Sequence, residues 1–153
     1  MVDLNVRALT EATVIVLPFM SEKSYIINTC SIASFVPNAR MSVYSATKAF
    51  VMSYTRSLRY ELRKRKINVT AVCPGPVDTP FFEIAEANGS TLMIKKYAMV
   101  SPKRVVALAL KDSYCRHSMS VCGAPIKALL LFAKLLPHGI ILKAMTYLKK
   151  RGL

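Results

Sequence analysis

A helix placed between two strands is the feature that most constrains how this chain folds. From about Val43 to Lys66 the sequence contains neither proline nor glycine and ends in a basic run, which predicts a long helix with cations in its last turn. Short β-branched runs precede and follow it, at residues 25–30 and 67–73, and each is typical of a strand, the first of them buried. Strands joined by a crossover helix run parallel in one sheet covered by helices, so the chain is predicted to be an α/β protein.

The remaining segments extend this unit on both sides. Residues 1–20 carry apolar side chains at helical spacing, with Pro18 near the end, which predicts a helix before the first strand. Residues 31–43 are mixed and indicate a loop, and residues 81–96 indicate a helical or loop segment. Ser101 and Pro102 are typical of a helix start, and residues 119–122 of a last strand. We therefore predict one domain over residues 1–123.

Residues 124–153 form an apolar tail with interspersed lysines. Its apolar stretches are interrupted by charged residues and by the break at Pro137–Gly139, and none reaches the 18–20 residues, roughly, that a membrane-spanning helix needs. Two amphipathic helices around the break are expected instead. Packing against the domain or another subunit and lying on an anionic membrane surface both remain open for this tail.

Charge and cysteine usage narrow the class of partner and site. The formal net charge is +14, from 22 Lys and Arg against 8 Asp and Glu, which leaves open a phosphate-bearing cofactor, acidic lipid or no special partner. The basic residues fall in short groups without a recognition-helix or zinc-finger pattern, so no nucleic-acid partner is predicted. The four cysteines form no C-x-x-C pair, and neither histidine has a ligand-like setting, so no metal site is predicted. Reduced thiols and a start without a basic leader favour an intracellular, cytoplasmic location, with a membrane-peripheral one left open.

Tyr44 and Lys48 are the first candidates for chemistry. They lie four residues apart and therefore on one face of the long helix. A tyrosine has an unperturbed pKa of about 10, and a nearby ammonium is expected to lower that pKa by stabilising the phenolate. The pair suits a tyrosine that exchanges a proton near neutrality, although the same spacing also occurs in helices by chance.

Two further polar segments are predicted to meet this pair. Ser31 follows the first strand, and residues 74–79, Pro-Gly-Pro-Val-Asp-Thr, follow the second. Open α/β sheets bind ligands beyond the carboxyl ends of their strands. The hydroxyl, the phenol–ammonium pair and the proline–glycine loop are thus expected at one edge of one sheet.

Taken together, these motifs resemble the short-chain dehydrogenase/reductase family. Residues 26–31 are similar to the strand that ends in the family's catalytic serine, Tyr44 to Lys48 match its Y-x-x-x-K motif, and residues 73–79 match its proline–glycine loop. Asp3 to Val6 resemble the segment that bears its catalytic asparagine. The resemblance covers about residues 1–80 and implies the C-terminal half of a Rossmann-like, doubly wound parallel sheet.

The resemblance also implies a role for each motif residue. Tyr44 would exchange the proton, Lys48 would assist it, Ser31 would position the carbonyl, and Asn5 would hold a water near Lys48. The cofactor, NAD or NADP with NADP slightly preferred, would contact Tyr44, Lys48, Pro74, Gly75, Val77 and Thr79. Substrate would contact Ser31, Phe81 and Phe82. The simpler alternatives are that Ser31 only ends a strand, Asn5 is an ordinary helix residue and Thr79 caps a helix.

One departure from the family pattern concerns glycine. Complete members carry a glycine-rich turn that receives the pyrophosphate, whereas the five glycines here are far apart. The sheet would lack its first four strands and expose a hydrophobic edge. Three interpretations stay open: part of a normal enzyme, a truncated inactive protein that binds proteins or membrane surfaces, or a short reductase completed by homo-oligomerisation.

The substrate class is indicated by the segment after the second strand. Residues 81–100 would form a lid over the site, and its apolar side chains favour a small lipophilic ketone or alcohol. The residues concerned are Phe81, Phe82, Ile84, Leu92, Met93, Ile94, Tyr97 and Met99.

Overall fold

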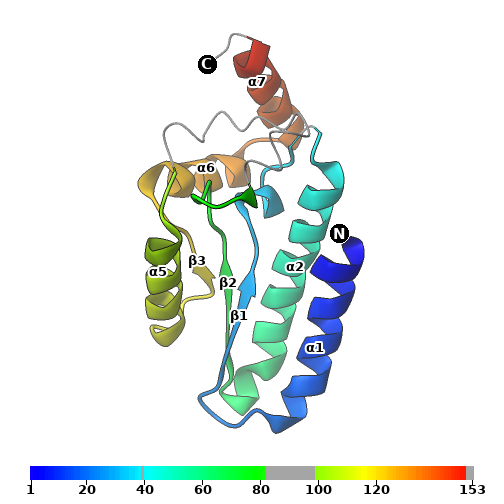
Figure 1. Ribbon diagram of the computed structural model, residues 1–153, viewed down its shortest axis with the longest axis vertical. Coiled ribbons are helices and arrows are strands. Elements are labelled where there is room, and N and C mark those ends of the chain that lie inside the picture. The colour runs from blue at the N-terminus through cyan, green and yellow to red at the C-terminus, as the bar shows by residue number, and fades with distance from the viewer. Residues whose placement is uncertain (39, 82–98, 151–153) are drawn as a thin grey trace.

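The computed structural model describes residues 1–38, 40–81 and 99–150. Within these ranges three strands, β1 (Tyr25–Thr29), β2 (Asn68–Val72) and β3 (Met119–Ser120), form one parallel sheet in the order β1-β2-β3. Helix α2 (Ser42–Glu61) connects β1 to β2 and lies on one face of the sheet, while α5 (Pro102–Tyr114) lies on the other (Figure 1). The predicted α/β class and the strand–helix–strand unit are confirmed.

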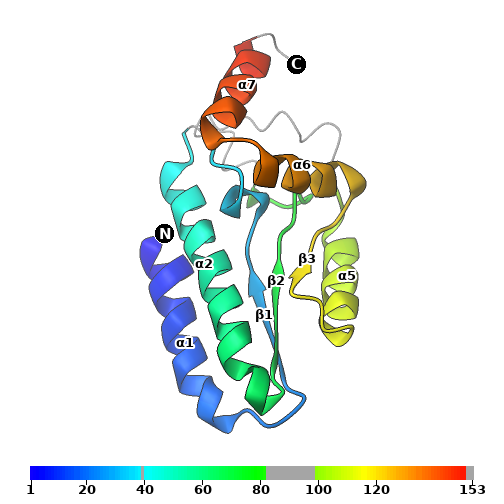
Figure 2. The ribbon, with the colours of Figure 1, turned by 180° about the vertical axis from the view of Figure 1, so that it is seen from behind.

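The N-terminal helix is less regular than its apolar spacing predicts. It begins as a π-helical stretch, Asp3–Ala8, continues as α1 (Leu9–Val16), and ends in a 3₁₀ turn, Leu17–Phe19, that contains Pro18. Helix α1 runs alongside α2, as both views show (Figures 1 and 2). The wider π turn places Asn5 next to α2, and π turns inside helices are frequent at functional sites.

Helix α2 is held by an apolar face packed on the sheet. Val51 and Met52 join a core cluster with Ala71 of β2 and with residues that follow β1 and β2, and Leu58 joins a second cluster with Val69 nearer the helix end. Each fully buried side chain of this kind contributes roughly 1.5–3 kcal/mol relative to exposure. The helix ends in a 3₁₀ turn, Leu62–Arg65, and Lys66 takes a left-handed conformation that leads into β2.

Strand β1 is not buried, contrary to the prediction. Tyr25 and Ile27 are 39% and 37% exposed, whereas every residue of β2 is buried. The reason is position in the sheet, because within the described residues β1 pairs only with β2 and its other side has no strand. The hydrophobic edge that the sequence predicts is therefore present, and it is formed by β1.

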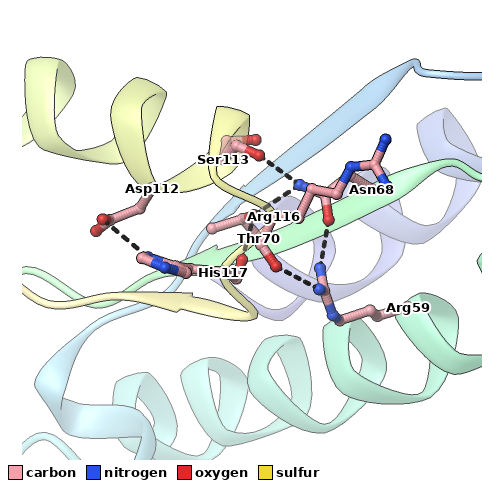
Figure 3. Close-up of polar contacts among 7 residues, drawn as sticks. All are labelled: Arg59, Asn68, Thr70, Asp112, Ser113, Arg116 and His117. Atoms are coloured by element: carbon pink, nitrogen blue, oxygen red, sulfur yellow. Dashed lines mark hydrogen bonds and ion pairs between the residues drawn. The ribbon is translucent and has the colours of Figure 1, made fainter.

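Polar contacts fasten the amino ends of the strands to the helices. Arg59 of α2 donates to the Asn68 side-chain oxygen at 2.5 Å and to the Arg116 backbone oxygen at 2.6 Å (Figure 3). It also donates to the Val69 backbone oxygen at 2.8 Å. Asn68 in turn donates to the Ser113 carbonyl at 2.7 Å. One guanidinium thus joins α2, β2 and the turn between α5 and β3.

The segment from residue 99 onward follows the predicted order. Ser101 caps α5 by accepting from the Arg104 amide, as its place before Pro102 predicts. β3 is shorter than predicted, because residues 121 and 122 leave the ladder to enter the core as buried apolar side chains.

The tail forms α6 (Ala124–Leu135) and α7 (His138–Lys150), which confirms two helices separated at the Pro137 break. Ile126 of α6 is only 1% exposed and belongs to the core cluster, whereas α7 projects away from the sheet (Figure 1). The division of the chain at residue 123 stays a prediction. Across the described ranges, no helix combines the length and apolar character needed to cross a membrane.

Candidate active site

A pocket of about 230 Å³ opens beyond the carboxyl ends of β1 and β2. It is walled by the segment after β1, the first two turns of α2 and the loop after β2, which the parallel topology brings to one edge. Of the residues singled out in the sequence, the pocket gathers Ser31, Tyr44, Lys48, Pro74, Gly75, Val77, Thr79 and Phe81. The meeting of the three motifs at one edge is confirmed, while their chemical roles stay predictions.

Ser31 is positioned by two neighbouring loops. Its backbone is extended, and its hydroxyl oxygen caps the 3₁₀ turn Ile32–Ser34 by accepting from the Ala33 amide at 3.2 Å. The Ile32 amide donates to the Pro74 carbonyl at 3.1 Å and ties this turn to the loop after β2. The turn-capping role and the pocket position coexist, because a hydroxyl that accepts one bond still has its own hydrogen to donate.

Tyr44 and Lys48 lie on the face of α2 that lines the pocket. The Lys48 ammonium nitrogen is 5.8 Å from the centre of the Tyr44 ring and donates to the Thr29 carbonyl at 2.9 Å. This bond anchors the lysine at the end of β1. The Tyr44 ring lies against Phe81, with the ring centres 5.6 Å apart.

The pKa of Tyr44 is raised above its ordinary value, so the prediction of a lowered pKa is wrong for the chain alone. Burial disfavours the phenolate and is the largest cause, and it outweighs the opposing effect of a hydrogen bond with Ser31. Burial also lowers the pKa of Lys48. Sequence spacing places the ammonium near the phenol but does not report the burial, which here decides the direction.

Asn5 faces a second groove on the other side of Lys48. Its amide nitrogen donates to the Thr47 hydroxyl at 3.1 Å, and the groove that it lines is shared with Lys48 and Thr29. The hydrogen bond fixes the carboxamide next to the lysine. Asn5 therefore lies next to Lys48 but does not line the pocket that Ser31 and Tyr44 share.

The loop after β2 is shaped by a close approach to α6. A Cβ atom on Gly75 would lie 2.7 Å from Ile126 Cδ1, so only glycine lets the loop pack against this buried side chain. Further along, Val77 bridges to Val100, and the Thr79 hydroxyl contacts the Val77 carbonyl at a long 3.4 Å. Thr79 lines the pocket. The alternative that it caps the following helix concerns residues outside the described ranges and stays a prediction.

Some neighbours of the site were not singled out in the sequence. Asn38, Met41 and Cys30 line the pocket, and Thr47 orients Asn5. Cys30 and Thr47 lie inside the sequence motifs, so their position next to the motif residues could have identified them. Asn38 and Met41 lie in a loop without a recognisable motif, and nothing in the sequence marks them. Phe82 lies outside the described residues. Within those residues no three His, Cys, Asp or Glu side chains cluster as a metal site would need.

The sequence and the fold match known proteins at this point. Residues 1–89 match the sequence pattern of the short chain dehydrogenase family, and the chain belongs to this family. It is 36% identical over 110 residues to glucose and ribitol dehydrogenase homolog 2 of Arabidopsis thaliana, covering 68% of this chain and 37% of that protein. The chain thus spans little more than a third of the length of this curated relative.

Solved structures agree with the fold. A short-chain dehydrogenase from Sphingobium yanoikuyae in complex with NADPH aligns with a TM-score of 0.68 and 30% identity, over 84% of this chain and 51% of that one. A short chain dehydrogenase/reductase from Burkholderia phymatum in complex with NAD aligns with a TM-score of 0.70, over 84% of this chain and 54% of that one. The second is 20% identical, so this match bears on the fold alone. Both matches support the expected Rossmann-like parallel sheet.

Proposed function

We propose that this chain carries the proton-transfer half of an NAD(P)-dependent oxidoreductase site that interconverts a ketone and an alcohol. The observation that carries the proposal is the convergence of Ser31, Tyr44 and Lys48 on one pocket at the carboxyl edge of a parallel sheet. Open α/β sheets bind ligands at this edge. The family membership of the chain supports the reaction class.

Tyr44 is the proposed proton donor and acceptor. Its raised pKa keeps the phenol protonated in the chain alone, which suits donation to a developing alkoxide. Ser31 donates its remaining hydrogen to the same substrate oxygen and stabilises its charge. Lys48 is held by the Thr29 carbonyl with its ammonium 5.8 Å from the centre of the Tyr44 ring, and we propose that this charge favours the phenolate once the proton has left.

The residues present fit the nicotinamide end of a dinucleotide. Lys48 lines both the pocket and the Asn5 groove, and Pro74 to Thr79 supply a wall in which the Thr79 hydroxyl contacts the Val77 carbonyl at a long 3.4 Å. We propose that Tyr44, Lys48, Pro74, Gly75, Val77 and Thr79 hold this end. When bound, the cofactor gives or takes the hydride. NAD and NADP both remain candidates, because each occupies one of the aligned structures.

A lipophilic ketone or alcohol is the proposed substrate class. The pocket wall is mostly apolar, with Ile32, Met41 and Phe81 facing it alongside the polar reacting groups. Such a lining favours a ligand that is apolar apart from its reacting oxygen. Ser31 and Phe81 are the described residues proposed to contact it.

Thermal unfolding of the 153-residue chain with and without excess NADPH or NAD tests binding, and turnover of ketones tests chemistry. A cofactor present at about 100 times its Kd should stabilise a binding-competent chain by about 2.7 kcal/mol. If neither cofactor changes the melting temperature, the dinucleotide site belongs to a longer protein. The turnover assay is then carried out on that protein.

Tyr44→Phe is the decisive variant for the proposed role. Turnover should fall about 10²–10⁴-fold, the usual contribution of a positioned acid–base group, while the melting temperature stays close to that of the parent. Tyr60→Phe, at an exposed position in the last turn of the same helix, is the matched control and should keep full turnover. Equal turnover of the parent and the Tyr44→Phe variant would reject the proposal.

Binding to a membrane surface through the tail is a second candidate. Large apolar side chains are exposed on α6, on α7 and at Leu136 between them, and lysines accompany them. On the helices the apolar set is Leu131, Phe132, Leu135, Ile140 and Tyr147. Co-sedimentation with vesicles rich in phosphatidylserine, compared with neutral phosphatidylcholine vesicles, tests it. Retention by the anionic vesicles alone is expected, and loss of that retention on Phe132→Ser together with Leu135→Ser would locate the contact.

A further inference from the structure

A cysteine follows the carboxyl end of β1 and another follows that of β2, and the two lie directly across from each other. Cys30 follows β1 directly and Cys73 follows β2, and the Cys30 amide donates to the Val72 carbonyl at 2.8 Å. This bond continues the β1–β2 register past the Thr29–Val72 pair, so Cys30 lies opposite Cys73. Neighbouring strands are roughly 4.7–4.9 Å apart, which falls within the Cα separations of disulfide-linked cysteines, about 4.4–6.8 Å.

The two thiols contact each other in the core. Both cysteines are free and buried, 1% and 0% exposed, and both belong to the central apolar cluster. A hydrogen bond between the side chains lowers the pKa of Cys30 and raises the pKa of Cys73, and the Lys48 ammonium lowers the pKa of Cys30 further. Cys30 is therefore the thiol with more thiolate character, and the thiolate is the reactive form.

Access to the pair differs between its two members. Cys30 lines the candidate pocket next to Ser31 and Lys48, whereas Cys73 lies behind it and is not part of the lining. A small oxidant that enters the pocket therefore meets Cys30 first. Cys73 is placed to react with whatever forms there.

We propose that Cys30 and Cys73 are an oxidation-sensitive dithiol that a peroxide converts into a disulfide beneath the candidate site. The Cys30 sulfur attacks one peroxide oxygen, giving a sulfenic acid and releasing one water. The Cys73 sulfur then displaces the second oxygen as water and forms the S–S bond. Two thiols lose two electrons and two protons in all, and one peroxide is reduced to two waters.

Disulfide formation is expected to disturb the pocket. Ser31 and Pro74 are the next residues along the chain, so bridging moves both walls of the pocket at once. The bond should be reversible by added thiol, because a thiolate that enters the pocket can attack the disulfide at Cys30 by thiol–disulfide exchange.

Peptide mapping tests the proposal without relying on enzymatic activity. The Cys115→Ser chain is used, since Cys115 is exposed and would otherwise link two molecules. After hydrogen peroxide, the intact mass should fall by two hydrogens. Trypsin cuts after Lys23, Arg40, Lys66 and Lys95, so peptides 24–40 and 67–95 carry one cysteine each. Under non-reducing conditions these two peptides should be found joined, and dithiothreitol should separate them.

Matched variants assign the bond. Adding Cys122→Ser, another buried cysteine, should leave the joined peptides in place, whereas adding Cys30→Ser should remove them. Joining of peptide 24–40 to the Cys122 peptide, or direct oxidation of Cys30 to the sulfinic acid without a joined product, would overturn the proposal. The map of the Cys115→Ser chain decides the matter even if substitution of Cys30 impairs folding.

Discussion

The two ends of the sheet use their polar side chains differently. At the amino end, Arg59, Asn68 and Thr70 each bond to backbone or side-chain groups of another element at 2.5–2.8 Å (Figure 3). At the carboxyl end, the Ser31 hydroxyl accepts from the Ala33 amide at 3.2 Å and is hydrogen-bonded to Tyr44, and Thr79 makes a long contact at 3.4 Å; both side chains face a pocket. The difference indicates that one end of the sheet is built for stability and the other retains hydrogen-bonding capacity for a ligand.

Removing Arg59 should produce the largest change in stability. Arg59→Ala deletes three hydrogen bonds and leaves the Asn68 oxygen without its charged partner, so the free energy of unfolding should fall by about 2–4 kcal/mol. Urea unfolding followed by circular dichroism measures it. Arg63→Ala is the control, because among the described residues that exposed guanidinium lies over the Tyr60 ring at 4.9 Å, and its loss should cost below about 1 kcal/mol. Equal losses in both variants would contradict the proposed role of the amino end.

A substitution at the carboxyl end, Gly75→Ala, should lower the free energy of unfolding by a smaller amount, and only while Ile126 is present. Gly75→Ala forces a methyl group against Ile126 and should cost about 1–3 kcal/mol in the parent chain. In an Ile126→Ala background the same change should cost almost nothing, because both close atoms are gone. Gly139→Ala, where nothing lies within 4 Å of the added methyl, is the control. A penalty that persists in the Ile126→Ala background would point to the backbone, not to this contact.

The pH dependence of stability should report the burial of Tyr44, as the smallest of these effects. Because the folded pKa is raised, the unfolded chain loses this proton first as the pH increases. The group contributes fully below pH 10, its ordinary pKa, and stability is lost as the pH rises from there through the folded pKa. The parent should lose more stability than Tyr44→Phe over that interval, with Lys48 present in both chains. A parallel decline in the two chains would show that the phenol is not buried in solution.

Local patterns predicted the frame of the molecule well. The proline-free run predicted α2, the Ser101–Pro102 pair predicted the start of α5, and the Pro137 break predicted two tail helices, because each depends on neighbouring residues. The motifs also predicted that Ser31, Tyr44, Lys48 and the loop after β2 would share a pocket, whereas Asn5 lines a neighbouring groove.

Properties that depend on distant residues were not predictable in this way. The contact of Gly75 with Ile126 joins positions 51 residues apart, and no local pattern signals it. The direction of the Tyr44 pKa shift follows from burial that involves three separate segments. The exposure of Ile27 depends on where β1 lies in the sheet, not on its apolar sequence.

The open side of β1 has a consequence for behaviour at high concentration. A strand with one unpaired side offers backbone N–H and C=O groups to any extended segment that approaches. Within the described residues the sheet has one five-residue edge, at β1, and one two-residue edge, at β3. If two copies paired through β1, neither would keep a free five-residue edge. Association would then stop at dimers and would not continue into fibres. Dilution would then shift mass between one copy and two.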